Sequence, residues 1–278
     1  MDRPRTFRFR VVFASAGFAG LALLRCSAFS ENGAGSSGGV ADAAAEAEPV
    51  EASALDAGAD GAHADAADAE PPRACDSGCA GTAGPCEVRT GSLCIDATEV
   101  TTGDYAAFVA KKQNTPIVAG SPCGAVVVKN VGTRPDPLLP VTGVTFCEAR
   151  AYCIYAGKHL CGDVAGGPTT PSKVGTLQSA WYYACTAGSG QSTVLSGRCQ
   201  LGMNEPARAG TTCEGFTPGV FDMVGNVHEW VDSVDDAGTG ANFVGGGYRQ
   251  PTNSNCGYVS GGSIDSMLPD VGFRCCSQ

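Results

Sequence analysis

The cysteine content constrains the fold of this chain more than any other feature of its sequence. The chain has 278 residues and 15 cysteines, of which 14 follow Ala74. Cysteines at this density indicate either a disulfide framework formed in an oxidising compartment or a metal-binding protein. The 14 cysteines allow up to seven disulfides, and this leaves Cys26 without a partner.

The alternative to disulfides is metal binding, and the spacing of the cysteines helps to distinguish the two. Four cysteines have the spacing C-x3-C-x6-C-x7-C: Cys75, Cys79, Cys86 and Cys94. Structural zinc sites usually combine two tight pairs of cysteines, and this segment contains at most one. A non-haem iron site of two histidines and one carboxylate would need both His159 and His228. We therefore expect disulfides and keep the iron site as a minor alternative.

The N-terminus has the layout of a secretory signal sequence, which we place at residues 1–25. Arginines precede an uncharged run, Val11 to Leu24, that is shorter than the roughly 20 apolar residues of a membrane span. Leu23-Leu24-Arg25-Cys26 resembles a bacterial lipobox with Cys26 as the lipidated residue, although its third residue is not the usual small one. Ordinary signal-peptidase cleavage near Ala28 and an uncleaved anchor are the alternatives. All three place the rest of the chain outside the cytoplasm, and we expect an outer-membrane or periplasmic lipoprotein or a secreted protein.

Residues 26–73 are predicted to be a disordered acidic linker rich in Ala, Asp, Glu and Gly. Ten acidic residues and a single base, Arg73, lie between Glu31 and Arg73, and the run from Ala41 to Ala69 has no aromatic residue. Such a segment buries too little apolar surface to offset the entropy cost of ordering. We assign no role to His63 within it. The region after Ala74 has 17 acidic and 12 basic residues, a balance that argues against a nucleic-acid partner.

Residues 74–278 are predicted to form one α+β domain with short strands, long loops and few helices, because Gly, Pro, Ser and Thr turns are frequent. The segment from Val144 to Gly157 predicts a helix with Thr145 as N-cap and Glu148 completing a capping box. Two further helices are expected at Thr102–Lys112 and at Ser179–Ala187.

Five segments together resemble the formylglycine-generating enzyme, or sulfatase-modifying factor, family. They occur in the family's order and read CIDATEVT from Cys94, LPVTGV from Leu139 with AYCIYAGK following, GVFDMVGNVHEW from Gly219, GGGY from Gly245 and VGFRC from Val271. The resemblance implies the family's fold, an α+β domain similar to C-type lectins with little regular secondary structure and bound calcium. The segment after the central helix departs from the family pattern, since Cys161-Gly162-Asp163 and a longer insertion precede Trp181.

The residues that carry the family's catalytic activity are missing from this chain. Active members oxidise a substrate cysteine with O₂ and a copper(I) ion held by two cysteine thiolates, which are soft ligands suited to Cu(I). The position of the first copper cysteine is Gln250 here, and the family's preceding serine is Gly247. Cys256 corresponds to a structural cysteine of the family, 19 residues before Cys275. The resemblance therefore predicts no catalytic residues, no copper and no formylglycine-generating activity.

The resemblance also implies particular disulfides and a calcium site. Cys153 would bond Cys275, and Cys185 would bond Cys256. Two further bonds are suggested by position: Cys199 to Cys213, which enclose a short loop, and Cys276 to Cys94 if the first and last strands are neighbours. The calcium ligands carried over from the family are the side chains of Asp222 and Glu229 and the carbonyls of Gly225 and Val227, an oxygen set that suits Ca²⁺. The family usually has Trp at the position of His228.

We interpret the sequence as an exported, non-catalytic member of this fold that is tethered by the linker and binds an envelope protein or a glycan. Its contact with a membrane would be limited to the lipid anchor. The alternative is a formylglycine-generating-type oxidoreductase that oxidises protein cysteine with O₂ and uses Cys256 or the pair Cys275-Cys276. A redox enzyme should retain a reactive thiol, whereas the binding interpretation expects none.

Overall fold

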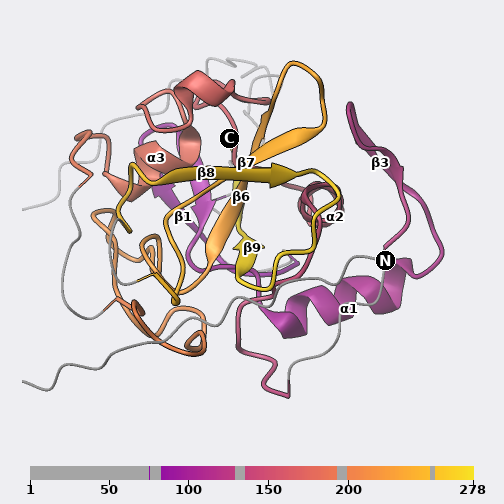
Figure 1. The fold of residues 1–278 in the computed structure, drawn as a ribbon, viewed down its shortest axis with the longest axis horizontal. Helices are drawn as coiled ribbons and strands as arrows, with labels where there is room; N and C mark the ends of the chain where they lie inside the picture. Colours follow the sequence, from indigo (N-terminus) through magenta and orange to yellow (C-terminus); the bar gives the residue numbers. More distant parts are fainter. Residues whose placement is uncertain (1–74, 76–82, 129–134, 193–198, 251–253) are drawn as a thin grey trace, which may run out of the picture. The chain divides into compact units, whose positions relative to one another are not determined.

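The computed structural model describes residues 75, 83–128, 135–192, 199–250 and 254–278 (Figure 1). All of them belong to the compact unit Ala64–Gln278. The predicted signal sequence with Cys26, and the linker with His63, lie outside the described residues.

The first sheet joins the two ends of the domain. Its strand order is β1 (Glu87–Thr90), β2 (Leu93–Asp96), β10 (Cys275–Ser277) and β5 (His159–Leu160), with every pair antiparallel. The C-terminal strand therefore lies between an early hairpin and a central strand.

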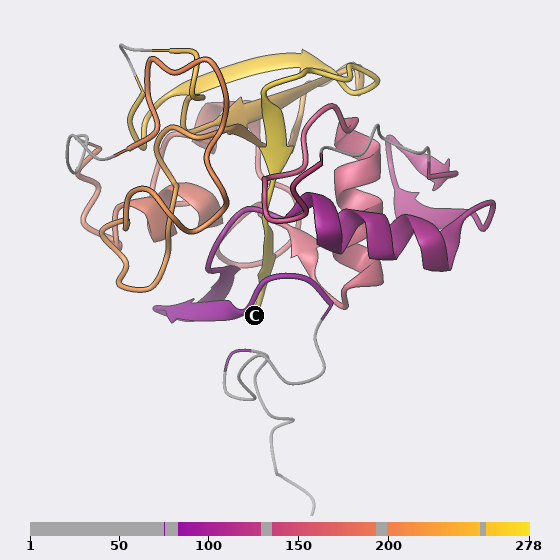
Figure 2. The same cartoon turned by 90° about the horizontal axis from the view of Figure 1, so that it is seen from below.

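The second sheet has the strand order β8 (Val259–Ser263), β7 (Gly240–Val244), β6 (His228–Val234) and β9 (Val271–Phe273). Strands β6 and β9 are parallel, and the other pairs are antiparallel. Only Arg274 separates β9 from β10, so one C-terminal segment runs from the second sheet into the first (Figure 2).

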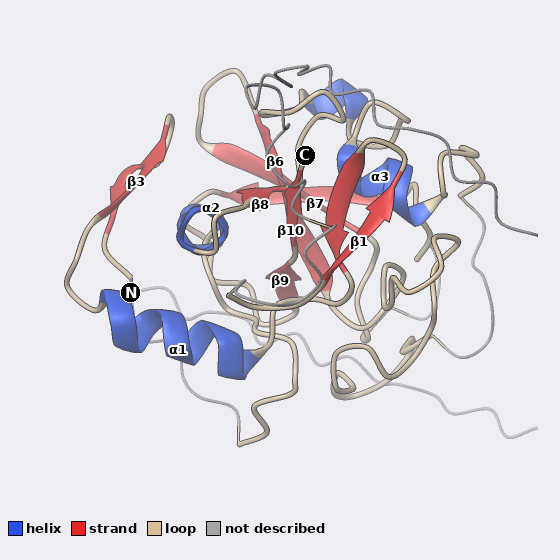
Figure 3. Cartoon of the chain, turned by 180° about the vertical axis from the view of Figure 1, so that it is seen from behind, coloured by secondary structure: helices blue, strands red, loops and turns tan. Residues whose placement is uncertain are grey.

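The helices are those that the sequence predicted. Helix α1 (Thr102–Lys112) and helix α2 (Phe146–Tyr155) each begin with a complete capping box, from Thr101 and Thr145 respectively. Helix α3 (Ala180–Cys185) begins at the N-cap Ser179. Figure 3 shows α1 and α2 on one side of the strands and α3 on the other.

Three minor elements complete the description of secondary structure. A short 3₁₀ helix covers Pro171–Lys173, and a separate hairpin consists of β3 (Ile117–Gly120) and β4 (Gly124–Val126). The Cys123–Cys147 disulfide ties the hairpin to α2. Loops make up much of the remaining chain (Figure 3), so the prediction of short strands, long loops and few helices is confirmed.

The apolar core has two parts. One surrounds α1 and α2 and contains Tyr105, Phe108, Tyr152 and Phe273, with ring centroids 5.3–6.3 Å apart. The other surrounds α3 and contains Trp181. Among the helices of the described residues, none has the length and hydropathy needed to cross a membrane.

Candidate functional site

The loop from Asp222 to Glu229 is built around two buried carboxylates. Asp222 and Asn226 have left-handed φ angles of 60° and 55°, and Gly225 has φ 83°, so the chain turns tightly. The carboxylate of Asp222 is fully buried and accepts from the amide N–H groups of Gly210 and Cys213 at 2.6 and 3.2 Å, and from the Thr212 hydroxyl. These bonds fix the loop to the preceding segment.

Arg274 is the positive charge of this cluster. Its side chain is fully buried, and two of its N–H groups donate to the two carboxylate oxygens of Glu229, each at 2.8 Å. Further guanidinium N–H groups donate to the carbonyls of Asp96 and Phe221 at 2.9 and 2.8 Å, while the Trp181 indole donates to Glu229 at 2.7 Å. Burial opposes the charged form, but the neighbouring carboxylates outweigh it and raise the pKa of Arg274.

Glu99 adds a third buried carboxylate. Its Oε1 accepts from the Asn226 side-chain amide at 2.8 Å, and its Oε2 has no hydrogen-bond partner among the described residues. Burial, and then the charge of Asp222, raise the pKa of Glu99 well above its usual range. The cluster thus holds three carboxyl groups and a single guanidinium, so it has room for one more positive charge or a proton.

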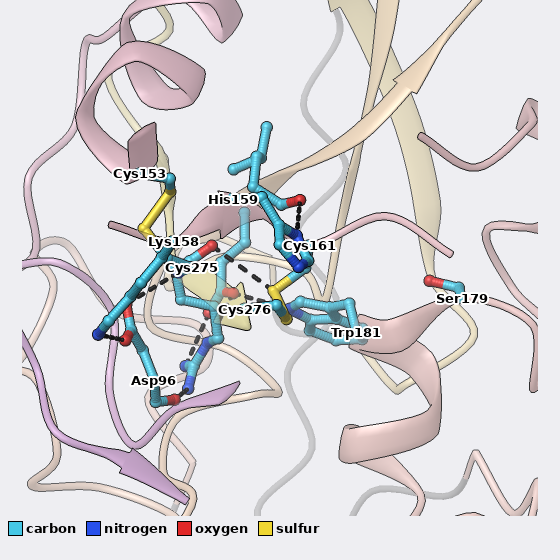
Figure 4. The surroundings of a disulfide bond; sticks show 12 residues. Asp96, Cys153, Lys158, His159, Cys161, Ser179, Trp181, Cys275 and Cys276 are labelled. Atoms are coloured by element: carbon cyan, nitrogen blue, oxygen red, sulfur yellow. Dashed lines mark hydrogen bonds and ion pairs between the residues drawn. A yellow bond between two sulfur atoms is a disulfide. The ribbon is translucent and has the colours of Figure 1, made fainter. Parts of the chain in front are cut away.

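A second buried ion pair lies beside the last strand (Figure 4). Lys158 Nζ is 2.5 Å from Asp96 Oδ1 and also donates to the carbonyl of Pro85 at 2.9 Å. The amide of Cys275 donates to Asp96 Oδ2 at 2.9 Å. Burial raises the pKa of Asp96 to about 7, although Lys158 acts in the opposite direction. This pair joins the first sheet to the segment that follows α2.

Consecutive cysteines of β10 are bonded to different partners on its two faces (Figure 4). Cys275 bonds Cys153 of α2, and Cys276 bonds Cys161 beyond β5. Side chains alternate across a strand, so these two bonds attach both cores to the last strand.

The remaining pairs can be compared with the expected ones. Cys153–Cys275, Cys185–Cys256 and Cys199–Cys213 coincide with the pairs proposed from the sequence. All thirteen cysteines that the structure describes are in disulfides.

The expected bond between Cys276 and Cys94 is wrong, because Cys94 bonds Cys75. Strands β2 and β10 are neighbours, as expected, but Cys276 lies opposite Ile95 and Cys94 lies opposite Ser277. Residues directly opposite share a face, so Cys94 and Cys276 are on opposite faces of the sheet and cannot bond.

The turn before Gln250 is shaped by three glycines. Gly245 and Gly246 have φ 86° and 80°, and a Cβ at Gly247 would lie 3.0 Å from Cδ2 of His228. Gln250, which the resemblance matches to the family's first copper cysteine, donates from its side-chain amide to the Tyr258 hydroxyl at 3.3 Å. The nearest cysteine along the sequence, Cys256, is held in its bond with Cys185.

The two histidines of the domain do not form an iron site. The ring of His228, on β6, packs against Phe243 and Tyr258 with centroid distances of 5.1 and 5.4 Å, and its burial lowers the pKa of His228. His159 lies on β5, and its electrostatic neighbour is Asp232. Asp232 is four residues beyond His228, or about 13 Å along an extended strand. Among the described residues no three His, Cys, Asp or Glu side chains are arranged to hold a metal ion.

The calcium residues proposed from the sequence come together only in part. Asp222 and Glu229 lie in one buried cluster, but their oxygens accept hydrogen bonds from protein groups. The carbonyls of Gly225 and Val227 accept no hydrogen bond from the described residues. Sequence reasoning assigns no role to Arg274 or Glu99, which lie in the motifs VGFRC and CIDATEVT; the charged residue within VGFRC is the one local signal of a buried ion pair.

Comparisons with known proteins match this chain to one family of protein domains. The family described as "Sulfatase-modifying factor enzyme 1-like domain" matches residues 63–278. PvdO from Pseudomonas aeruginosa is 16% identical, with a TM-score of 0.49, over 67% of this chain and 80% of PvdO. CarF is 18% identical, with a TM-score of 0.46, over 66% of this chain and 85% of CarF. Treponema denticola variable protein 1 is 18% identical, with a TM-score of 0.42, over 66% of this chain and 84% of that protein. No curated protein matches the chain.

Proposed function

This chain belongs to the family of sulfatase-modifying factor enzyme 1-like domains, and on that premise we propose that it is an exported, non-catalytic member that acts as an envelope-tethered binding module. Family membership confirms the disulfide-rich α+β fold that the resemblance implied. The observation that carries the proposal is that Cys256, Cys275 and Cys276, the cysteines nearest to Gln250 in the C-terminal part of the sequence, are all in disulfides.

The proposed lack of catalysis is supported by the chemistry of the family's reaction, which needs two free thiolates. The family's Cu(I) is held by two cysteine sulfurs, and Gln250 offers only amide oxygen and nitrogen at the first of these positions. Cys256 is 1% exposed and bonded to Cys185, and Cys275 and Cys276 are bonded to cysteines elsewhere in the fold. A thiol or disulfide reaction would therefore have to open a buried bond first.

Counting thiols tests this proposal. We expect iodoacetamide to label no cysteine from Cys75 to Cys276 in denatured, unreduced protein, because the thirteen cysteines that the structure describes are in disulfides and the total of fourteen is even. Peptide mass spectrometry locates any label, and a reduced sample in which all fourteen sites are labelled serves as the control. Stoichiometric labelling of Cys256, Cys275 or Cys276 would favour the oxidoreductase instead.

Export and tethering are supported by the disulfides and by the N-terminal sequence. Disulfides at this density are typical of proteins that fold outside the cytosol. We propose that residues 1–25 are the signal, that Cys26 carries a lipid, and that residues 26–73 span the distance from the membrane to the domain.

We also propose calcium as a structural ligand of the loop from Asp222 to Glu229, with the carbonyls of Gly225 and Val227 completing the set. The surplus of negative charge in the cluster supports it, since three buried carboxyl groups share one guanidinium. The two carbonyl oxygens without hydrogen-bond donors among the described residues also support it. A bound cation would offset the like-charge repulsion that acts on Glu99.

Calcium is expected to raise the melting temperature relative to EDTA. At a concentration of 100 times the dissociation constant, binding stabilises a folded protein by about 2.7 kcal/mol. Differential scanning calorimetry in each buffer measures the shift. Asp222→Asn should abolish it, whereas Asp235→Asn, which removes an exposed carboxylate elsewhere, should leave it unchanged. Equal melting temperatures in calcium and EDTA would exclude the site.

A further inference from the structure

An open cavity lies beside the glycine turn, where Tyr248 and Arg249 form part of its lining. It has a volume of about 370 Å³, within the range of small-molecule sites. Its lining comes from three separate segments and consists of Pro135, Leu139, Asn204, Glu205, Tyr248 and Arg249. None of these six residues takes part in a disulfide or in one of the ion pairs between described residues.

The cavity is lined by one positive and one negative side chain, and neither forms an ion pair with another described residue. Arg249 and Glu205 are exposed, and no ion pair among the described residues involves either of them. The neighbouring Arg208 differs, because it is paired with Asp136 at 2.6 Å. Arg249 and Glu205 are opposite charges that do not pair with each other. A ligand that carries one charge of each sign would complement both.

Arg249 is held on a rigid support. Its Cζ lies 5.3 Å from the ring centroid of Tyr248, a cation–π contact. Tyr248 is 2% exposed, its amide donates to the carbonyl of Asn226 at 2.7 Å, and its carbonyl accepts from Met203 at 2.7 Å. The stacking limits the motion of the guanidinium and leaves its N–H groups available to a carboxylate.

The remaining wall is apolar. Pro135 and Leu139 line the cavity, and the adjacent Leu138 is 51% exposed. The carbonyl of Leu138 accepts from the amide of Ala209 at 2.9 Å, which ties this segment to the one that carries Glu205. An apolar side chain of the ligand would be covered by these residues.

We propose that this cavity binds a zwitterionic α-amino acid with an apolar side chain. The α-carboxylate bonds to Arg249, the α-ammonium to Glu205, and the side chain packs on Pro135 and Leu139. Asn204, with both a donor and an acceptor, completes the polar lining. The inference rests on the proposed binding role, because it supplies the ligand for a domain without catalytic thiols.

Isothermal titration calorimetry of the full chain tests the two charges separately. L-leucine is the probe, and N-acetyl-L-leucine and L-leucine methyl ester each lack one of its charges. We expect L-leucine to bind, and each derivative to bind at least about tenfold more weakly, the loss that follows from one charge-assisted hydrogen bond. No binding of L-leucine up to about 10 mM would overturn the proposal.

Two variants test which protein side chain contacts which charge of the amino acid. Arg249→Gln should weaken L-leucine about tenfold and leave the methyl ester unaffected, while Glu205→Gln should weaken L-leucine and leave the N-acetyl derivative unaffected. Arg208→Gln removes a nearby charge that does not line the cavity and should leave the affinity unchanged. N-acetyl-L-leucine binding as tightly as L-leucine would contradict the ammonium contact and indicate a peptide C-terminus instead. These outcomes do not depend on the thiol count, so either proposal can fail alone.

Discussion

Replacing Arg274 by methionine is expected to lower the free energy of unfolding by about 3–5 kcal/mol, because it leaves the buried carboxylate of Glu229 without its charged partner. The substitution also removes the donors to the carbonyls of Asp96 and Phe221, which join three separate parts of the chain. Urea unfolding followed by circular dichroism measures the change.

Arg249→Met is the matched control for this prediction. Arg249 is exposed and has no ion pair among the described residues, so its loss should change the free energy of unfolding by no more than about 0.5 kcal/mol. Arg274→Lys should not restore wild-type stability, because an ammonium cannot form the paired contacts of a guanidinium. Equal stability of the Arg274→Met and Arg249→Met proteins would contradict the central place given to Arg274.

Removing both disulfides of β10, Cys153–Cys275 and Cys161–Cys276, as the quadruple alanine variant, is expected to lower the free energy of unfolding by at least about 4 kcal/mol. The two bonds join residues 122 and 115 apart, and together they restrict the unfolded chain over a long loop that either one alone would still close. They also fix both cores to the last strand. Chemical unfolding under non-reducing conditions provides the measurement.

The Cys199–Cys213 bond provides the comparison, because its cysteines are only 14 residues apart. Its removal should cost about 3 kcal/mol, less than the loss of the longer loop. The reverse order of the two costs would show that strain or local packing, and not the length of the closed loop, determines what these bonds contribute.

The helices could be predicted because their signals are local. Thr145 and Glu148 lie three residues apart and form the same capping box in the structure, and Thr101 and Asp104 form a second one. The longest strand, β6, includes the end of the most specific family motif. These features depend on neighbouring residues and not on the register between distant strands.

The partner of Cys276 could not be predicted in the same way. The neighbouring positions of β2 and β10 follow from the family's topology, but a shift of one residue decides which face each cysteine occupies. Strands of three and four residues carry too little pattern to fix that register.

The buried charge cluster also could not be predicted from neighbouring residues in the sequence. Arg274 and Glu99 are separated by 175 residues in the chain, and both lie in motifs that resemble ordinary buried strands. Only the folded structure shows that Arg274 pairs with Glu229 and that Glu99 accepts a hydrogen bond from Asn226 in the same loop. The proposed absence of the copper cysteines rests instead on residue identity at the positions that the resemblance matches, and it stays a prediction.

The most direct test of the central claim is to incubate the purified protein with Cu(I), O₂ and a peptide containing Cys-x-Pro-x-Arg, and to follow the peptide by mass spectrometry. An active member of the family serves as the positive control. We predict no conversion of the peptide cysteine to formylglycine, because Gln250 and the bonded Cys256 cannot supply two thiolates. Copper-dependent formation of the aldehyde at a rate above that of free copper would contradict the claim.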